Sequence, residues 1–166
     1  MRYYDLYESP QGRMLLVAGD EGLSGVYFDG QKYLPQIEPE WRRDARHAPL
    51  RQAKRELAEY FGGGRERFET ALAPEGTPFQ RSVWKAISTV AFGETITYRE
   101  LARRAGRPDS VRAAGAATGR NPISIIVPCH RIVGSSGGLT GYAGGLDRKR
   151  ALLALESGIP ELLSAA

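Results

Sequence analysis

Apolar residues in the first 75 positions form short runs between turn-forming stretches and then change to helical spacing. Three strands are predicted, at residues 2–7, 13–18 and 23–28, with stretches rich in Gly, Pro, Ser and Asp between them. Apolar side chains then recur at helical spacing from Leu50 to Phe61 and stop at Gly62. The pattern predicts a small antiparallel sheet with one helix of about 12 residues packed on it.

The second half of the chain shows helical signals after residues 73–76, a stretch with Pro and Gly that we take as the domain boundary. A capping box at residues 77–80 predicts a helix that continues to Gly93. A second box, at residues 97–100, predicts a short helix that Gly106 ends, and a third helix follows. Two short helices joined by a glycine-containing turn are typical of a helix-turn-helix. The predicted domains are residues 1–73 and 77–166.

The third of these helices, from about Ser110, has one face of mostly small residues. At 100° per residue that face holds Arg112, Gly115, Ala116 and Gly119. Glycine inside a helix costs about 1 kcal/mol relative to alanine, so two glycines on one stripe indicate a surface that is approached closely. DNA is one candidate for that approach and a neighbouring helix is the other.

Cys129 is the single cysteine of the chain, and it directly precedes His130. Residues 123–127 predict a fully buried strand that Pro128 ends, so Cys129 would lie at the end of the core. A lone cysteine is more often a packing residue than a nucleophile, and both interpretations apply here. Consecutive side chains of extended backbone point to opposite faces, so a contact between Cys129 and His130 requires a turn or a bridging water molecule, and we expect the water.

The last predicted helix, over residues 146–156, ends at Gly158 and carries Glu156 on its apolar side. A carboxylate there costs several kcal/mol unless it is paired. Glu156 therefore either lies at the rim of the core or has a basic partner, for which His130 is the one histidine in this half of the chain.

Charge is divided unevenly along the chain. Residues 1–77 contain 11 Lys and Arg against 13 Asp and Glu, whereas residues 78–166 contain 12 against 6. The net charge is +4. This asymmetry indicates a polyanionic partner for the C-terminal half.

Composition also excludes several classes of protein. The sequence has no apolar stretch of the roughly 18 residues that a membrane span needs, and its first residues lack the apolar core of a signal peptide, so we expect a cytoplasmic protein with no membrane partner. One cysteine and two histidines leave no internal disulfide and no zinc-site spacing, so we expect no metal.

Several short motifs follow one another over about half of the chain. They are Thr77-Pro78-Phe79-Gln80, Gly93-Glu94-Thr95, Tyr98, Arg112, Asn121-Pro122, Pro128-Cys129-His130-Arg131, Gly141-Tyr142-Ala143-Gly144-Gly145 and Glu156. In these motifs the chain resembles the O6-alkylguanine-DNA alkyltransferases, also called methylated-DNA–protein-cysteine methyltransferases. The resemblance implies an α+β fold. It implies a small N-terminal antiparallel sheet with a packed helix, an α/β domain of the ribonuclease-H-like roll type, followed by a mostly helical, winged-helix-like domain with a helix-turn-helix.

The resemblance also implies a function in DNA repair by direct reversal. The protein would bind double-stranded DNA through the minor groove, flip an O6-alkylguanine out of the stack, and transfer the alkyl group irreversibly to Cys129 without a cofactor. The protein would be consumed in one turnover. Whether O4-alkylthymine is also repaired, and whether several copies of a monomer bind DNA cooperatively, is left open.

The site residues that the resemblance implies form two groups. The catalytic group is Cys129, His130, Glu156 and Asn121, in which Glu156 orients His130, His130 deprotonates Cys129 through water, and Asn121 braces the turn. The DNA- and substrate-binding group is Tyr98, Arg112, Gly115, Ala116, Gly119, Ile132, Tyr142 and Ala143. Within it, Arg112 would fill the gap left by the flipped base, and Tyr98 would help rotate the nucleotide and contact the guanine.

Two departures from the family and two rival functions affect this interpretation. Ala143 stands where some relatives have serine, which puts the preference for bulky adducts in doubt, and the N-terminal zinc cysteines of some relatives are missing. One rival is a non-catalytic alkyltransferase-like protein that binds lesions, but such proteins replace the cysteine that this chain retains. The other is a cysteine hydrolase, whose Cys and His are usually distant in sequence.

Overall fold

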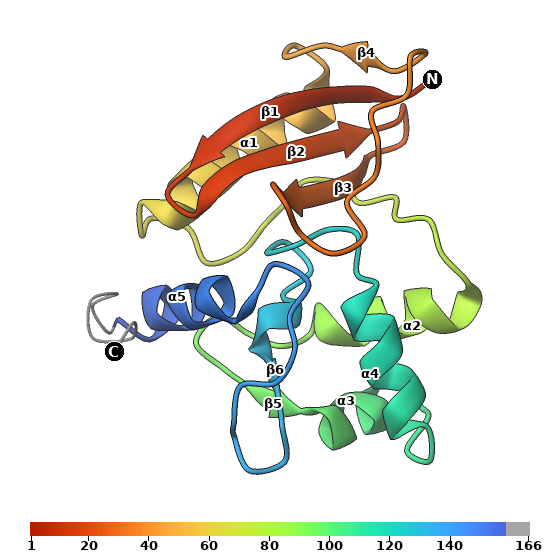
Figure 1. The fold of residues 1–166 in the computed structure, drawn as a ribbon, viewed down its shortest axis with the longest axis vertical. Coiled ribbons are helices and arrows are strands. Elements are labelled where there is room, and N and C mark those ends of the chain that lie inside the picture. Colours follow the sequence, from red (N-terminus) through yellow and green to blue (C-terminus); the bar gives the residue numbers. More distant parts are fainter. Residues whose placement is uncertain (159–166) are drawn as a thin grey trace. The chain divides into compact units, whose positions relative to one another are not determined.

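The computed structural model describes residues 1–158 and divides the chain into two compact units. The first unit consists of Met1–Glu75 together with Pro122–Ser124. The second consists of Gly76–Asn121 and the chain from Ile125 onward. The fold is α+β, with the sheet in the first unit and most of the helices in the second (Figure 1).

The sheet of the first unit is built from the three strands that the sequence predicts. β1 (Tyr3–Ser9), β2 (Gly12–Ala18) and β3 (Leu23–Phe28) are antiparallel neighbours, joined by tight turns. β4 (Arg42–Arg43) adds a short parallel edge to β1, so the strand order is β3-β2-β1-β4. The sequence pattern missed β4, because two exposed arginines form no apolar run.

Helix α1 (Ala48–Phe61) lies across the sheet and packs on β1, β2 and β3 (Figure 1). Its buried side chains include Leu50, Ala53, Leu57 and Tyr60, which recur every three or four residues. The helix ends where the sequence predicts, because Gly63 takes the left-handed backbone conformation with φ of 81°.

The second unit begins with α2 (Pro78–Ile87), whose capping box is complete. The Thr77 hydroxyl accepts from the Gln80 amide, and the Gln80 side chain accepts from the Thr77 amide. The prediction that this helix continues to Gly93 is wrong, since α2 ends at Ile87. The Thr89 hydroxyl then donates to the Ala86 carbonyl, an alternative to helical hydrogen bonding that favours a turn.

Two short helices follow, α3 (Tyr98–Arg104) and α4 (Val111–Gly119), and they pack against each other and against α2. Only half of the predicted capping box forms at α3. Thr97 accepts from the Glu100 amide, but the Glu100 carboxylate pairs with Arg103 and Arg104 instead of returning to Thr97. A short turn through Gly106, with φ of 77°, joins the pair as a helix-turn-helix requires.

The predicted strand over residues 123–127 is wrong. Ile123 forms a single bridge with Val26, within the first unit, and the chain then turns at Ile125, which has φ of 72°. All five residues are buried. The apolar run therefore predicts burial correctly. It does not pair as a strand, because prolines lie at both of its ends and the positive φ of Ile125 turns the chain.

The rest of the second unit carries the cysteine and the last helix. Cys129–Arg131 forms the short 3₁₀ helix η1, followed by β6 (Ile132–Val133), which pairs in parallel with β5 (Ile96–Thr97). α5 (Leu146–Ser157) packs on η1 and ends at Gly158 in the left-handed conformation. Between Met1 and Gly158 no helix is long and apolar enough to cross a membrane.

Candidate active site and nucleic-acid interface

Cys129 is buried at the start of η1, and Asn121 holds the turn that leads to it. The Asn121 side-chain amide donates to the Val127 carbonyl at 2.9 Å and lies 3.1 Å from Cys129 Sγ. Burial raises the pKa of the Cys129 thiol, while the Asn121 hydrogen bond and the charge of Lys149 act in the opposite direction. Because burial is the largest of these effects, the thiol needs a base to become a thiolate.

His130 is fully buried and contacts Glu156 through one ring nitrogen. Nε2 lies 2.6 Å from Glu156 Oε2. An ionised carboxylate only accepts, so Nε2 carries the proton and Nδ1 has its lone pair available. Burial lowers the pKa of His130, although Glu156 raises it. Within residues 1–158 Nδ1 has no hydrogen-bond partner, so His130 has the form of a neutral base.

The neighbouring side chains of Cys129 and His130 do not form a direct hydrogen bond within the described chain. η1 supplies a turn instead of the extended backbone that the sequence pattern predicts. The only side-chain hydrogen bond to Sγ among these residues comes from Asn121. A proton would therefore pass between the thiol and the imidazole through a water molecule.

Glu156 is held by Arg131, a residue that belongs to the Pro128–Arg131 motif but to which the sequence analysis gave no role. Arg131 donates from Nε to Oε1 at 2.8 Å and from Nη2 to Oε2 at 3.0 Å. Burial alone would raise the pKa of Glu156, but its bonds and charge interactions with His130 and Arg131 lower the value to about 2. Glu156 is therefore ionised at neutral pH. Of the two predicted positions, it has the buried one with a basic partner and not the one at the rim of the core.

Lys149 is a second residue that the sequence analysis missed. Its ammonium is buried in α5 and donates to the carbonyls of Ile132 at 2.7 Å and Thr140 at 2.8 Å. These two bonds close the loop between β6 and α5, which continues into Tyr142 and Ala143. In the sequence Lys149 lies between two arginines, so residue type alone could not distinguish it.

The candidate DNA-binding residues lie on and beside α3 and α4. Tyr98 begins α3, and its ring lies 3.7 Å from where a Cβ at Gly115 would be. Arg112, Ala116 and Gly119 are exposed on α4. A Cβ at Gly119 would meet nothing within 4 Å, and one at Gly115 only an ordinary contact, so helix packing within the protein does not require these glycines.

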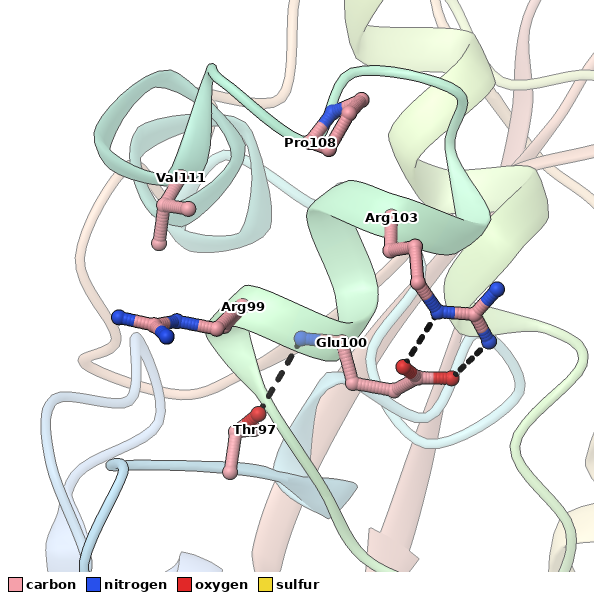
Figure 2. A pocket seen from close by; sticks show the side chains of 6 residues that line it. All are labelled: Thr97, Arg99, Glu100, Arg103, Pro108 and Val111. Atoms are coloured by element: carbon pink, nitrogen blue, oxygen red, sulfur yellow. Dashed lines mark hydrogen bonds and ion pairs between the residues drawn. The ribbon is translucent and has the colours of Figure 1, made fainter.

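A pocket lies where the start of α3 faces the start of α4 (Figure 2). Figure 2 shows Glu100 bonded to Arg103, while Arg99 points away from that pair. Hydrogen bonds from Arg103 and Arg104 hold the pKa of the Glu100 carboxyl at about 2. The lining residues are Thr97, Arg99, Glu100, Arg103, Pro108 and Val111.

The remaining candidates lie around the loop that Lys149 closes. Ile132 is fully buried, whereas Tyr142 and Ala143 are half-buried. The Thr140 hydroxyl lies 3.4 Å from the Tyr98 hydroxyl, so this loop and the start of α3 are neighbours within the second unit. No group of three or more His, Cys, Asp or Glu in residues 1–158 is arranged to hold a metal ion.

The fold and these contacts define an α+β protein with a helix-turn-helix and a buried thiol beside an imidazole–carboxylate pair. Two family models match almost the whole chain. The ribonuclease-like domain of 6-O-methylguanine DNA methyltransferase matches residues 2–74, and the DNA-binding domain of the same family matches residues 78–158. The chain therefore belongs to the 6-O-methylguanine DNA methyltransferase family.

Individual relatives agree with this assignment. The chain is 49% identical over 154 residues to the methylated-DNA–protein-cysteine methyltransferase of Methanosarcina barkeri, covering 93% of this chain and 96% of that one. It is 43% identical to the Haemophilus influenzae protein of the same name, over 93% of this chain and 86% of that one. A crystal structure of Mycobacterium tuberculosis OGT in complex with DNA is similar with a TM-score of 0.88 and 40% identity, covering 99% of both chains.

Proposed function

We propose that this protein repairs alkylated DNA by moving the alkyl group from O6-alkylguanine to its own Cys129. The observation that carries the proposal is the buried network in which Glu156 binds His130 Nε2 at 2.6 Å and so leaves Nδ1 as the proton acceptor. Membership of the methyltransferase family and the similarity to a relative bound to DNA support the same reaction.

The reaction is a displacement at the alkyl carbon. His130 takes the thiol proton through water, and the Cys129 thiolate attacks the carbon attached to O6 of guanine. The C–O bond breaks as the S–C bond forms, and its electron pair remains on the guanine, where Tyr98 donates a proton or hydrogen bond. Both reacting groups belong to Cys129 and the damaged base, so the reaction needs no cofactor.

The product explains why each molecule would act once. The thioether has no proton to lose, and the Cys129 thiolate is a poor leaving group from the alkyl carbon, so nothing in the network regenerates the thiolate. The protein is therefore a stoichiometric alkyl acceptor, which we expect to act as a monomer.

DNA would reach Cys129 through α4. Gly119 and Ala116 have few or no side-chain atoms, so the minor groove could approach the backbone of α4 closely. The exposed Arg112 would fill the space that the flipped nucleotide vacates. Flipping costs a few kcal/mol and costs less for a weakly paired base, so the lesion itself contributes to selection. We expect O6-alkylguanine to be the main substrate.

The Cys129→Ala variant tests the proposal. It should transfer no alkyl group from a duplex containing O6-methylguanine, yet bind that duplex within about threefold of the wild-type Kd, because alanine removes the nucleophile and leaves α4 intact. Gel-shift titration and methyl transfer are measured side by side. Wild-type protein that binds the lesion without accepting the methyl group would instead indicate a lesion-binding protein.

A further inference from the structure

Arg131 contacts both oxygens of Glu156 but takes no direct part in the proposed proton transfer. Besides those two bonds, its Nη1 donates to the Val90 carbonyl at 2.7 Å. The residue is 5% exposed. A buried guanidinium that binds one carboxylate through two nitrogens has a fixed position and a permanent charge.

Arg131 affects the electrostatic environment of His130 through the Glu156 carboxylate that both residues contact. The charged groups that face the imidazole are Glu156 and Lys149 on α5 and Arg131 on η1, with the Cys129 thiol beside it. Glu156 Oε2 accepts from both His130 and Arg131. The carboxylate is therefore already balanced by a cation, and a protonated imidazole gains less from it than an unbalanced carboxylate would provide.

We propose that Arg131 is a positioning residue that balances Glu156 and so keeps His130 as a neutral base with its proton on Nε2. Without that cation the buried Glu156 would hold His130 as an imidazolium, and an imidazolium has no lone pair to accept the Cys129 proton. The inference rests on the proposed function, because it concerns the base of the alkyl transfer.

The test is a pH titration of the two imidazoles by ¹⁵N NMR in the full-length protein without DNA. The chain has only His47 and His130, so His47 serves as an internal reference. Wild-type His130 should remain neutral and protonated on Nε2 at pH 7. In Arg131→Met its titration midpoint should rise by about one pH unit or more, since removing a nearby like charge has effects of this size.

Two further variants make the result specific. Arg131→Lys keeps the charge but not the two-nitrogen contact, so its midpoint should lie between those of wild type and Arg131→Met. Arg65→Met is the matched control, because Arg65 also pairs with a glutamate, Glu59, but in the first unit. Its His130 midpoint should equal that of the wild type.

A His130 midpoint that is unchanged or lower in Arg131→Met would overturn the inference, as would a wild-type His130 that is already protonated at pH 7. If Arg131→Met does not fold, Arg131→Lys decides, and the absence of an upward shift in it counts against the inference. The titration involves no DNA and no alkyl transfer. Loss of the proposed function would therefore leave its result intact, and the two failures are distinguishable.

Discussion

Glu156 is the residue on which the polar contacts around Cys129 converge. It accepts from His130 and from Arg131 and is almost completely buried. Removing one partner of a buried charged group leaves the other charge uncompensated and costs about 3 to 5 kcal/mol. The stability of the second unit should therefore depend on Glu156 as much as the proposed chemistry does.

Glu156→Gln should lower the free energy of unfolding by about 3 kcal/mol at pH 7, because Arg131 keeps its charge and loses its partner. The folded pKa of Glu156, about 2, lies below the ordinary value of 4.5, so the folded state binds fewer protons. Its contribution is complete above pH 4.5 and is lost as the pH falls to 2. Urea unfolding between pH 7 and pH 3 measures both effects.

In the variant, stability should fall less steeply below pH 4.5 than in the wild type, since the titrating group is gone. Equal slopes for the two proteins would mean that Glu156 does not carry the charge in this network.

At the scale of elements, α4 presents a surface that the protein itself does not use. Gly119 has open space around it, and Ala116 beside it on the same face is exposed. Packing on α2 and α3 uses the opposite side, through Ala114, Ala117 and Thr118, all of which are buried. The small residues are therefore available for a partner that must come close.

Gly119→Leu separates the fold of α4 from its proposed use. The variant should unfold at the same temperature as the wild type or higher, because leucine favours helix and has room at this position. Its affinity for duplex DNA should fall at least tenfold, because the side chain occupies the space that the minor groove needs. Thermal unfolding and fluorescence anisotropy with a labelled duplex give the two readouts.

The reaction of Cys129 with iodoacetamide should be unchanged in this variant, which serves as the control for an intact site. Undiminished DNA affinity would show that α4 is not the surface that meets the groove.

The same elements show what the sequence could predict. Short apolar runs between turn-forming stretches predicted β1, β2 and β3, and the capping residues Thr77 and Thr97 predicted where α2 and α3 begin, since these signals are local. The run before Cys129 was misread as a strand because apolarity reports burial and not backbone conformation. β5 and β6 are two residues each, too short for a period to show.

The candidate site follows the same division. Cys129 and His130 are adjacent in sequence, and Glu156 is conspicuous because it lies on an apolar face, so all three could be singled out. Arg131 and Lys149 could not, because the sequence has many exposed cations of the same type and only the fold shows which of them are buried. Contacts between residues far apart in the sequence determine which cations are buried, and such contacts leave no pattern in the local sequence.

At the scale of the whole molecule, the excess of cations in the C-terminal half and the family assignment point to the same polyanion. A protein that neutralises phosphates with arginines releases counterions, and log K falls with log salt by about 0.9 for each contact. Arg99 lines the pocket at the start of α3, and its side chain points away from Glu100 (Figure 2).

Arg99→Ala should reduce the slope of log K against log salt for duplex binding by about 1. It should weaken binding to undamaged and damaged duplexes equally, because a phosphate contact carries no sequence information. Anisotropy titrations at 50 to 200 mM NaCl measure the slope. Arg55→Ala, an exposed cation on α1, is the matched control and should leave the slope unchanged. Equal slopes for wild type and Arg99→Ala would show that Arg99 does not contact the DNA phosphates.

In the proposed reaction Cys129 itself takes the alkyl group, once. Excess duplex carrying [methyl-³H]O6-methylguanine is incubated with wild-type protein, and the label is counted and located by peptide mass spectrometry. We expect one methyl group per molecule, on Cys129, with no further reaction after that. Label released into solution, more than one methyl group per protein, or a methyl group on any other residue would contradict it.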